Sequence, residues 1–145
     1  MSVAERLSAA RPGRQLLLLV AATAALAGCG RAGTIDDAVL AAADADSANW
    51  LSYGRTYSEQ RFSPLRQIDE QSVGRLGLAW WLDLGTRNGL EATSLVHNGI
   101  LYTTSAWSVV YAVDAATGKL LWRFDPAVPK EHAKFVCCDV VNRGV

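Results

Sequence analysis

The sequence lacks a long apolar segment, an excess of charge of one sign and a dense set of cysteines or histidines. Its mostly apolar segment at residues 16–27 is shorter than the ~20 residues that a membrane-spanning helix needs, so we expect no crossing of the membrane. The 145 residues carry 14 basic and 14 acidic side chains, and the slight negative charge of the part beyond residue 28 argues against nucleic acid as a partner. Half of the residues are apolar and five are tryptophan, which excludes a disordered chain.

The first 28 residues have the pattern of a secretory signal peptide. Arg6, Arg11 and Arg14 form a basic start, and residues 16–27 form an apolar region of the usual length. We therefore expect residues 1–28 to direct export and to be removed.

The apolar region ends in Leu26-Ala27-Gly28-Cys29, which resembles the bacterial lipobox. This resemblance implies that Cys29 is lipidated and anchors the chain, since several acyl chains hold a protein firmly to a membrane. The absence of Asp at position 30 favours the outer membrane. An ordinary signal peptide with a chance cysteine at its cleavage site stays open. Residues 29–49 offer no aromatic side chain and are predicted to be a flexible tether, with a short helix near residues 38–43.

The part after residue 50 has the patterns of β-structure. Residues 78–84 are a compact apolar run between two glycines, which predicts a buried strand. Asn98-Gly99 favours a two-residue type I′ turn, and residues 114–118 favour a second turn. Four antiparallel strands are expected around these turns, at residues 92–97, 100–105, 108–113 and 119–124. Their number and spacing match one blade of a β-propeller, and a lone blade needs neighbours to cover its two faces.

Two of the three cysteines, Cys137 and Cys138, are adjacent. Thiols tend to pair in an oxidising compartment. However, consecutive Cα atoms lie about 3.8 Å apart across a trans peptide, which is closer than the roughly 4.4–6.8 Å of most disulfides. Three states therefore stay open: a vicinal disulfide, pairing of each cysteine with another one, and two reduced thiols.

A resemblance to a known motif begins at Ala112. The segment that ends at Trp122 resembles the tryptophan docking motif of quinoprotein propellers, which has Ala first, Gly seventh and Trp eleventh; Ala112, Gly118 and Trp122 match these positions. In that family the indole of one blade stacks on a peptide plane of the next. A core aromatic is the alternative for Trp122, and both interpretations make it structural.

Further segments resemble, in order, the N-terminal part of alcohol dehydrogenases that depend on pyrroloquinoline quinone (PQQ). They are residues 50–55, 60–65, 76–80, 89–93 and 137–144. These enzymes are eight-bladed propellers several times longer than this chain. The resemblance implies an all-β fold in which residues 50–145 form the N-terminal portion of such a propeller, about one complete blade plus a closing strand at residues 78–84. The chain is thus expected to be a fragment of a larger protein.

The same resemblance implies which residues bind the cofactor. Arg143 matches the family's cofactor-binding arginine, with a surface ion pair as the alternative. Glu91 matches a glutamate that hydrogen-bonds the cofactor edge, although a lone glutamate before a strand is usually solvated. Cys137 and Cys138 match a vicinal disulfide that packs against the PQQ plane, and this ring favours alcohols over glucose as substrates.

No catalytic residue and no metal ligand is expected within the chain itself. The family's catalytic aspartate and its calcium ligands come from later blades, and Asp139 is expected to make local turn contacts. His97 and His132 lie far apart in sequence without the spacing of metal ligands. No C-x-x-C-H segment for haem attachment is present in the sequence.

These observations predict the N-terminal part of a periplasmic, lipid-anchored alcohol dehydrogenase that uses PQQ and calcium. It would oxidise a small alcohol to an aldehyde and pass electrons to a cytochrome c or a quinone, and this chain alone would be inactive. The alternative is a non-enzymatic propeller lipoprotein that acts as a scaffold for outer-membrane assembly. That alternative does not predict Glu91, Cys137, Cys138 and Arg143 together.

Overall fold

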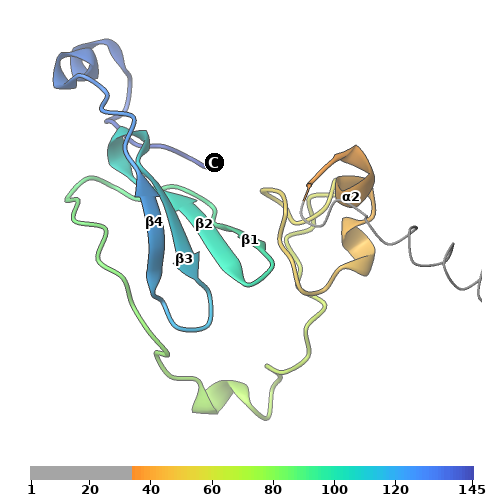
Figure 1. Cartoon of the computed structure of the whole chain (residues 1–145). Helices are drawn as coiled ribbons and strands as arrows, with labels where there is room; N and C mark the ends of the chain where they lie inside the picture. Colours follow the sequence, from red (N-terminus) through yellow and green to blue (C-terminus); the bar gives the residue numbers. More distant parts are fainter. Residues whose placement is uncertain (1–33) are drawn as a thin grey trace, which may run out of the picture. The chain divides into compact units, whose positions relative to one another are not determined.

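The computed structural model describes residues 34–145, and residues 36–145 form one compact unit. Four antiparallel strands make a single sheet in the order β1-β2-β3-β4 (Figure 1). The strands are β1 (Leu95–His97), β2 (Ile100–Thr104), β3 (Val110–Asp114) and β4 (Leu120–Phe124). This meander confirms the predicted all-β fold and its four strands.

The tight turns form where the sequence predicts them. Asn98 and Gly99 both have positive φ, 50° and 75°, as a type I′ turn between β1 and β2 requires. After β3, the carboxylate of Asp114 accepts the backbone N–H of Thr117 at 2.8 Å, and Gly118 has a φ of 73°. Local hydrogen bonding by aspartate and the freedom of glycine therefore close both hairpins.

All four strands differ from the predicted bounds, β2 and β4 by one residue and the starts of β1 and β3 by two or more. β1 begins at Leu95 instead of residue 92, since only three of its residues pair with β2. β3 begins at Val110 instead of residue 108, because Trp107 and Ser108 have φ values of 65° and 57°. Residues in this left-handed region cannot continue a strand, so the chain turns before β3 within the short 3₁₀ segment Ala106–Ser108, in which Trp107 itself has non-helical dihedrals.

The prediction of a buried strand at residues 78–84 is wrong. No strand is assigned there, and Leu78 and Trp81 are 82% and 74% exposed. The core of the sheet is a cluster of Val109, Tyr111 and Val113. Every second side chain of residues 80–84 packs against this cluster, namely Trp80, Leu82 and Leu84. Among residues 34–145 no strand pairs with this segment, so it covers the sheet core with one face only.

Trp80 holds this segment to the turn between β3 and β4. Its indole Nε1 donates a hydrogen bond to the carbonyl oxygen of Ala115 at 3.0 Å. A Cβ atom on Gly118 would lie 2.5 Å from the Trp80 ring, so only glycine allows this contact. Trp122, by contrast, is 47% exposed and contacts the ring of Tyr102, with 6.1 Å between the centroids. The docking role of Trp122 stays a prediction.

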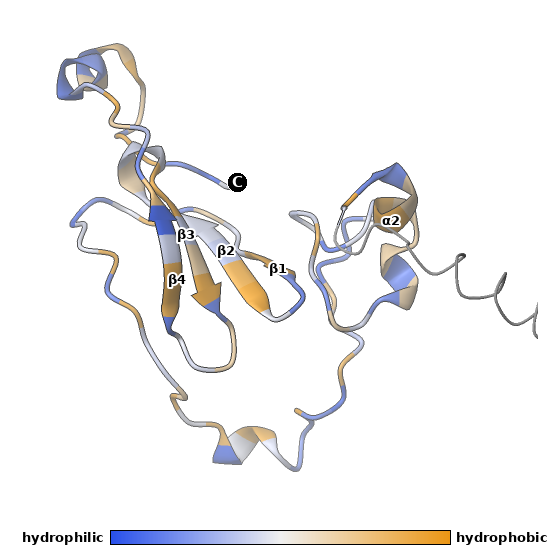
Figure 2. Ribbon diagram, viewed as in Figure 1, coloured by the Kyte–Doolittle hydropathy of each residue, from blue (hydrophilic) through white to orange (hydrophobic). Residues whose placement is uncertain are grey.

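The strand β4 has little cover in the described structure. All five of its residues are exposed, including Leu120, Leu121, Trp122 and Phe124. Figure 2 shows hydrophobic residues along β4 as well as along β2 and β3. Because burial of apolar surface is the main driving force of folding, an apolar strand this exposed is typical of a surface that packs against another element.

A short helical segment precedes the sheet. The helix α2 (Asp37–Ala41) overlaps the predicted residues 38–43, and the Asp36 side chain caps it by accepting the N–H of Val39 at 3.0 Å. A 3₁₀ helix (Ala43–Ala45) follows it. Two further 3₁₀ helices lie at Val73–Arg75 and Lys130–Phe135. The assignment of residues 29–49 as a flexible tether stays a prediction.

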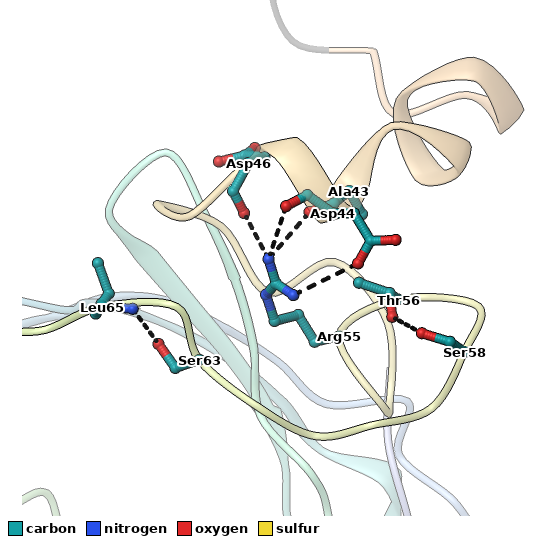
Figure 3. Close-up of polar contacts among 8 residues, drawn as sticks. All are labelled: Ala43, Asp44, Asp46, Arg55, Thr56, Ser58, Ser63 and Leu65. Carbon is teal, nitrogen blue, oxygen red and sulfur yellow. Dashed lines mark hydrogen bonds and ion pairs between the residues drawn. The ribbon is translucent and has the colours of Figure 1, made fainter.

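The buried side chain of Arg55 fastens this helical segment to the residues that follow. Its Nη2 donates to the backbone oxygens of Ala43, Asp44 and Asp46 at 3.3, 3.3 and 3.4 Å, and Nη1 lies 3.8 Å from the Asp44 carboxylate (Figure 3). Trp50 then exchanges two backbone hydrogen bonds with Val96 on β1, at 2.8 and 2.9 Å. These contacts tie residues 43–50 to the sheet.

The predictions for the start of the chain lie outside the described residues. They are the signal peptide at residues 1–28 and lipidation of Cys29. In the described part of the chain, no helix has the length and apolarity needed to cross a membrane.

Candidate functional site

A hollow of about 440 Å³ lies between the loop that precedes β3 and the segment after the last 3₁₀ helix. This volume is within the range of small-molecule sites. Its lining is mainly apolar and includes Trp107, Val128, Val141, the two adjacent cysteines and Arg143. The hollow therefore combines apolar surface with charged groups of both signs, the guanidinium of Arg143 and the carboxylate of Asp139.

A disulfide joins Cys137 to Cys138 in this wall. Cys138 and the following Asp139 have φ values of 70° and 75°, which non-glycine residues rarely adopt. Such conformations persist only where surrounding contacts enforce them, and they cluster at functional sites. Both cysteines are exposed, so the ring is available to a ligand.

Contacts to Asp139 hold one side of this turn. Asn88 Nδ2 donates to both carboxylate oxygens at 3.1 Å, and the Val140 N–H donates to Oδ1 at 2.7 Å. The Asn88 bond, and then that from Val140, keep the pKa of the Asp139 carboxyl below its usual value. Besides the expected local contact, Asp139 thus connects the turn to a residue 51 positions earlier in the chain.

Arg143 and Glu91 come together although 52 residues separate them. Arg143 Nε donates to Glu91 Oε2 at 3.2 Å, and the two side chains are 81% and 45% exposed. An exposed ion pair of this kind is weak. The pair uses only Nε, so the guanidinium has further donors to offer to an anionic ligand at the rim of the hollow.

Sequence reasoning missed two parts of this site. Trp107 lines the hollow, and the side chain of Asn142 joins the cysteine segment to the loop that contains Trp107. The positive φ of Trp107 gave no signal in sequence, and Asn142 was visible only as part of the segment at residues 137–144. Among residues 34–145, no group of three or more His, Cys, Asp or Glu could hold a metal ion.

The chain is similar in sequence to known proteins. The family model for the PQQ "glucose/ethanol/alcohol dehydrogenase, beta-propeller domain" matches residues 50–145. Quinohemoprotein alcohol dehydrogenase ADH IIB of Pseudomonas putida is 53% identical over 93% of this chain and 19% of its own length. The dehydrogenase subunit of an alcohol dehydrogenase (quinone) of Komagataeibacter europaeus is 60% identical over 70% of this chain and 14% of its own length.

A solved structure supports the same relationship. The quinohemoprotein alcohol dehydrogenase ADHIIG of Pseudomonas putida HK5 superimposes with a TM-score of 0.73 at 52% identity, over 76% of this chain and 16% of that one. The chain therefore spans less than a fifth of the length of these relatives. Their names do not favour the scaffold alternative. The chain belongs to the family of the PQQ glucose/ethanol/alcohol dehydrogenase β-propeller domain.

Proposed function

We propose that the protein that contains this chain is a PQQ-dependent alcohol dehydrogenase, and that this chain supplies one wall of its cofactor pocket. One observation carries the proposal: the Cys137–Cys138 ring, the Trp107 side chain and Arg143 line a single hollow. The family match and the alcohol dehydrogenases among the relatives agree with it.

The residues of the hollow suit PQQ, which is a flat ortho-quinone with three carboxylates. The volume of about 440 Å³ falls in the range of cofactor-sized ligands, and the lining is mainly apolar. A planar ring needs a rigid surface to stack on, which the disulfide and Trp107 offer. A carboxylate needs fixed donors, which the Arg143 guanidinium supplies in a planar fork.

When bound, PQQ would supply the redox chemistry by accepting a hydride equivalent, that is, two electrons and one proton, from the alcohol carbon. This chain's own residues bind and orient. Cys137 and Cys138 exclude water from one face of the ring, and Arg143 anchors an oxygen at its edge. Glu91 accepts the 3.2 Å bond from Arg143 Nε, and the family resemblance assigns it a hydrogen bond to the cofactor edge.

Several parts of the proposal rest on the family resemblance. They are calcium as the metal, an aldehyde as the product, and a cytochrome c or a quinone as the electron acceptor. A periplasmic location and a lipid anchor at Cys29 rest on the sequence of the first 29 residues. No described residue is assigned to the metal or to the base that takes the alcohol proton.

Equilibrium titration with PQQ tests the proposal. The protein that contains this chain, freed of cofactor, is titrated while its tryptophan fluorescence is followed, and we expect saturable binding. Arg143→Ala should weaken binding about tenfold or more, because hydrogen bonds to charged groups contribute roughly 1.5–3 kcal/mol. Arg66→Ala is the matched control, since that exposed arginine is not among the residues that line the hollow. Absence of PQQ binding by the unmodified protein would refute the proposal.

A further inference from the structure

Asn142 connects the cysteine segment to the loop before β3. Its Oδ1 accepts the Thr104 hydroxyl at 2.9 Å, and its Nδ2 donates to the Ser108 Oγ at 3.0 Å. Both partners lie in or beside the loop that contains Trp107, and 38 and 34 residues separate them from Asn142. The side chain thus joins two parts of the hollow that are distant in sequence.

The loop that receives Asn142 is well fixed. Thr104 is 2% exposed at the end of β2, and the Ser105 N–H donates to the Val109 oxygen at 2.9 Å. The Trp107 N–H donates to the Val140 oxygen at 2.8 Å, which adds a backbone bond to the same segment. Asn142 is therefore held against an element whose own position is set by the sheet.

Asn142 also makes a hydrogen bond that spans the backbone of Arg143. Its Oδ1 accepts the N–H of Gly144 at 2.9 Å, which closes an Asx turn with Arg143 as the residue in the middle. The direction in which the Arg143 side chain leaves the backbone depends on this turn. The same oxygen accepts the Thr104 hydroxyl, so the turn is coupled to the buried end of β2.

We propose that Asn142 is a positioning residue for Arg143: by bonding Thr104, Ser108 and the Gly144 N–H, it presents the guanidinium to the cofactor. This inference rests on the proposed function, because it assigns to Arg143 the task of binding PQQ. Asn142 itself does not touch the cofactor. Its side chain accepts two hydrogen bonds and donates one. An aspartate at this position could not donate to Ser108 and would place a negative charge beside Arg143.

A double-mutant cycle on PQQ binding tests this role in the whole protein. Asn142→Ala alone should weaken binding about tenfold, because an arginine in the wrong direction loses its bonds to the carboxylate. In the Arg143→Ala background the same change should alter the dissociation constant less than about twofold, because a positioning residue acts only through the group that it positions.

Isosteric variants separate positioning from a general loss of structure. Thr104→Val removes the buried hydroxyl and should weaken PQQ binding several-fold, whereas Thr103→Val makes the same change one position earlier, away from Asn142, and should leave binding unchanged. All titrations are made well below the thermal unfolding midpoint of each variant, so that unfolding does not contribute. Ser108→Ala serves as a milder variant if Asn142→Ala fails to fold.

The outcomes distinguish this inference from the proposed function. The positioning role would be overturned if Asn142→Ala weakened PQQ binding by the same factor in the unmodified protein and in the Arg143→Ala variant. Unchanged PQQ binding by both Asn142→Ala and Thr104→Val would overturn it as well. If the unmodified protein does not bind PQQ, the proposed function fails and the inference fails with it. If it binds and Arg143→Ala weakens binding, any failure concerns Asn142 alone.

Discussion

The sheet and the wall of the hollow are held together by different forces. The sheet buries Val109, Tyr111 and Val113 under Trp80 and its neighbours. The wall at residues 137–143 is mostly exposed, and a disulfide and directed hydrogen bonds fix it. Apolar burial stabilises a fold without regard to direction, whereas hydrogen bonds fix orientation. The sheet therefore sets stability and the wall sets recognition. Substitutions in the sheet should change the free energy of unfolding, and substitutions in the wall should change the affinity for PQQ.

The largest effect is expected in the sheet, from Gly118→Ala. The residue has a φ of 73°, and its new Cβ would lie 2.5 Å from the Trp80 ring. The left-handed conformation costs about 1–2 kcal/mol and the clash adds to it, so we expect a loss of about 2–4 kcal/mol in the free energy of unfolding. Denaturant unfolding of the whole protein measures this loss, and the PQQ affinity of the folded protein should not change.

Gly99→Ala is the matched control for this prediction. Gly99 has nearly the same φ, 75°, but no atom lies within 4 Å of an added Cβ. It should therefore show the conformational cost alone, about 1–2 kcal/mol. Equal losses at both glycines would mean that the contact with Trp80 contributes nothing.

The second effect is expected in the wall, from replacing both Cys137 and Cys138 by serine. Adjacent cysteines enclose no chain segment, so their bond adds little by restricting the unfolded chain. We expect PQQ binding to weaken about tenfold while the unfolding midpoint stays nearly constant. A large fall in stability at unchanged affinity would contradict the division between the two regions.

The smallest effect is expected from Asn88→Ala, which leaves the Asp139 carboxylate without its main hydrogen-bond donor. The pKa of folded Asp139 is depressed, so its contribution to stability is present above the usual value of about 3.9 and is lost as pH falls through the folded value. The variant should raise this pKa. It should be slightly less stable at neutral pH, and the difference should vanish in strong acid.

Urea unfolding at several pH values measures the Asn88 effect, with Gln60→Ala as the control, since that exposed amide is not among the hydrogen-bond donors to Asp139. A stability difference that persists unchanged below the usual pKa of aspartate would show that Asn88 acts by some route other than this carboxylate.

Local chemistry made much of the sheet predictable. Asn98-Gly99 indicated its turn, because few residues tolerate positive φ at both positions. The strand predicted at residues 78–84 does not form, since an apolar run does not reveal whether a partner strand is present. The late start of β3 was also hidden, because the left-handed conformations of Trp107 and Ser108 follow from tertiary contacts.

The candidate site was predictable only as separate residues. Glu91, Cys137, Cys138 and Arg143 could be named from the family resemblance, but the pairing of Arg143 with Glu91 depends on a fold that brings together residues 52 positions apart. Asn142 was missed for the same reason, because its partners Thr104 and Ser108 carry no pattern that points to it.

A crystal structure of the whole protein loaded with PQQ tests the central claim most directly. We predict that the PQQ plane lies against the sulfur atoms of Cys137 and Cys138, with an oxygen of the cofactor bound by the Arg143 guanidinium. PQQ bound elsewhere in the protein, with this disulfide and Arg143 facing solvent, would contradict the claim that these residues form a wall of the cofactor pocket.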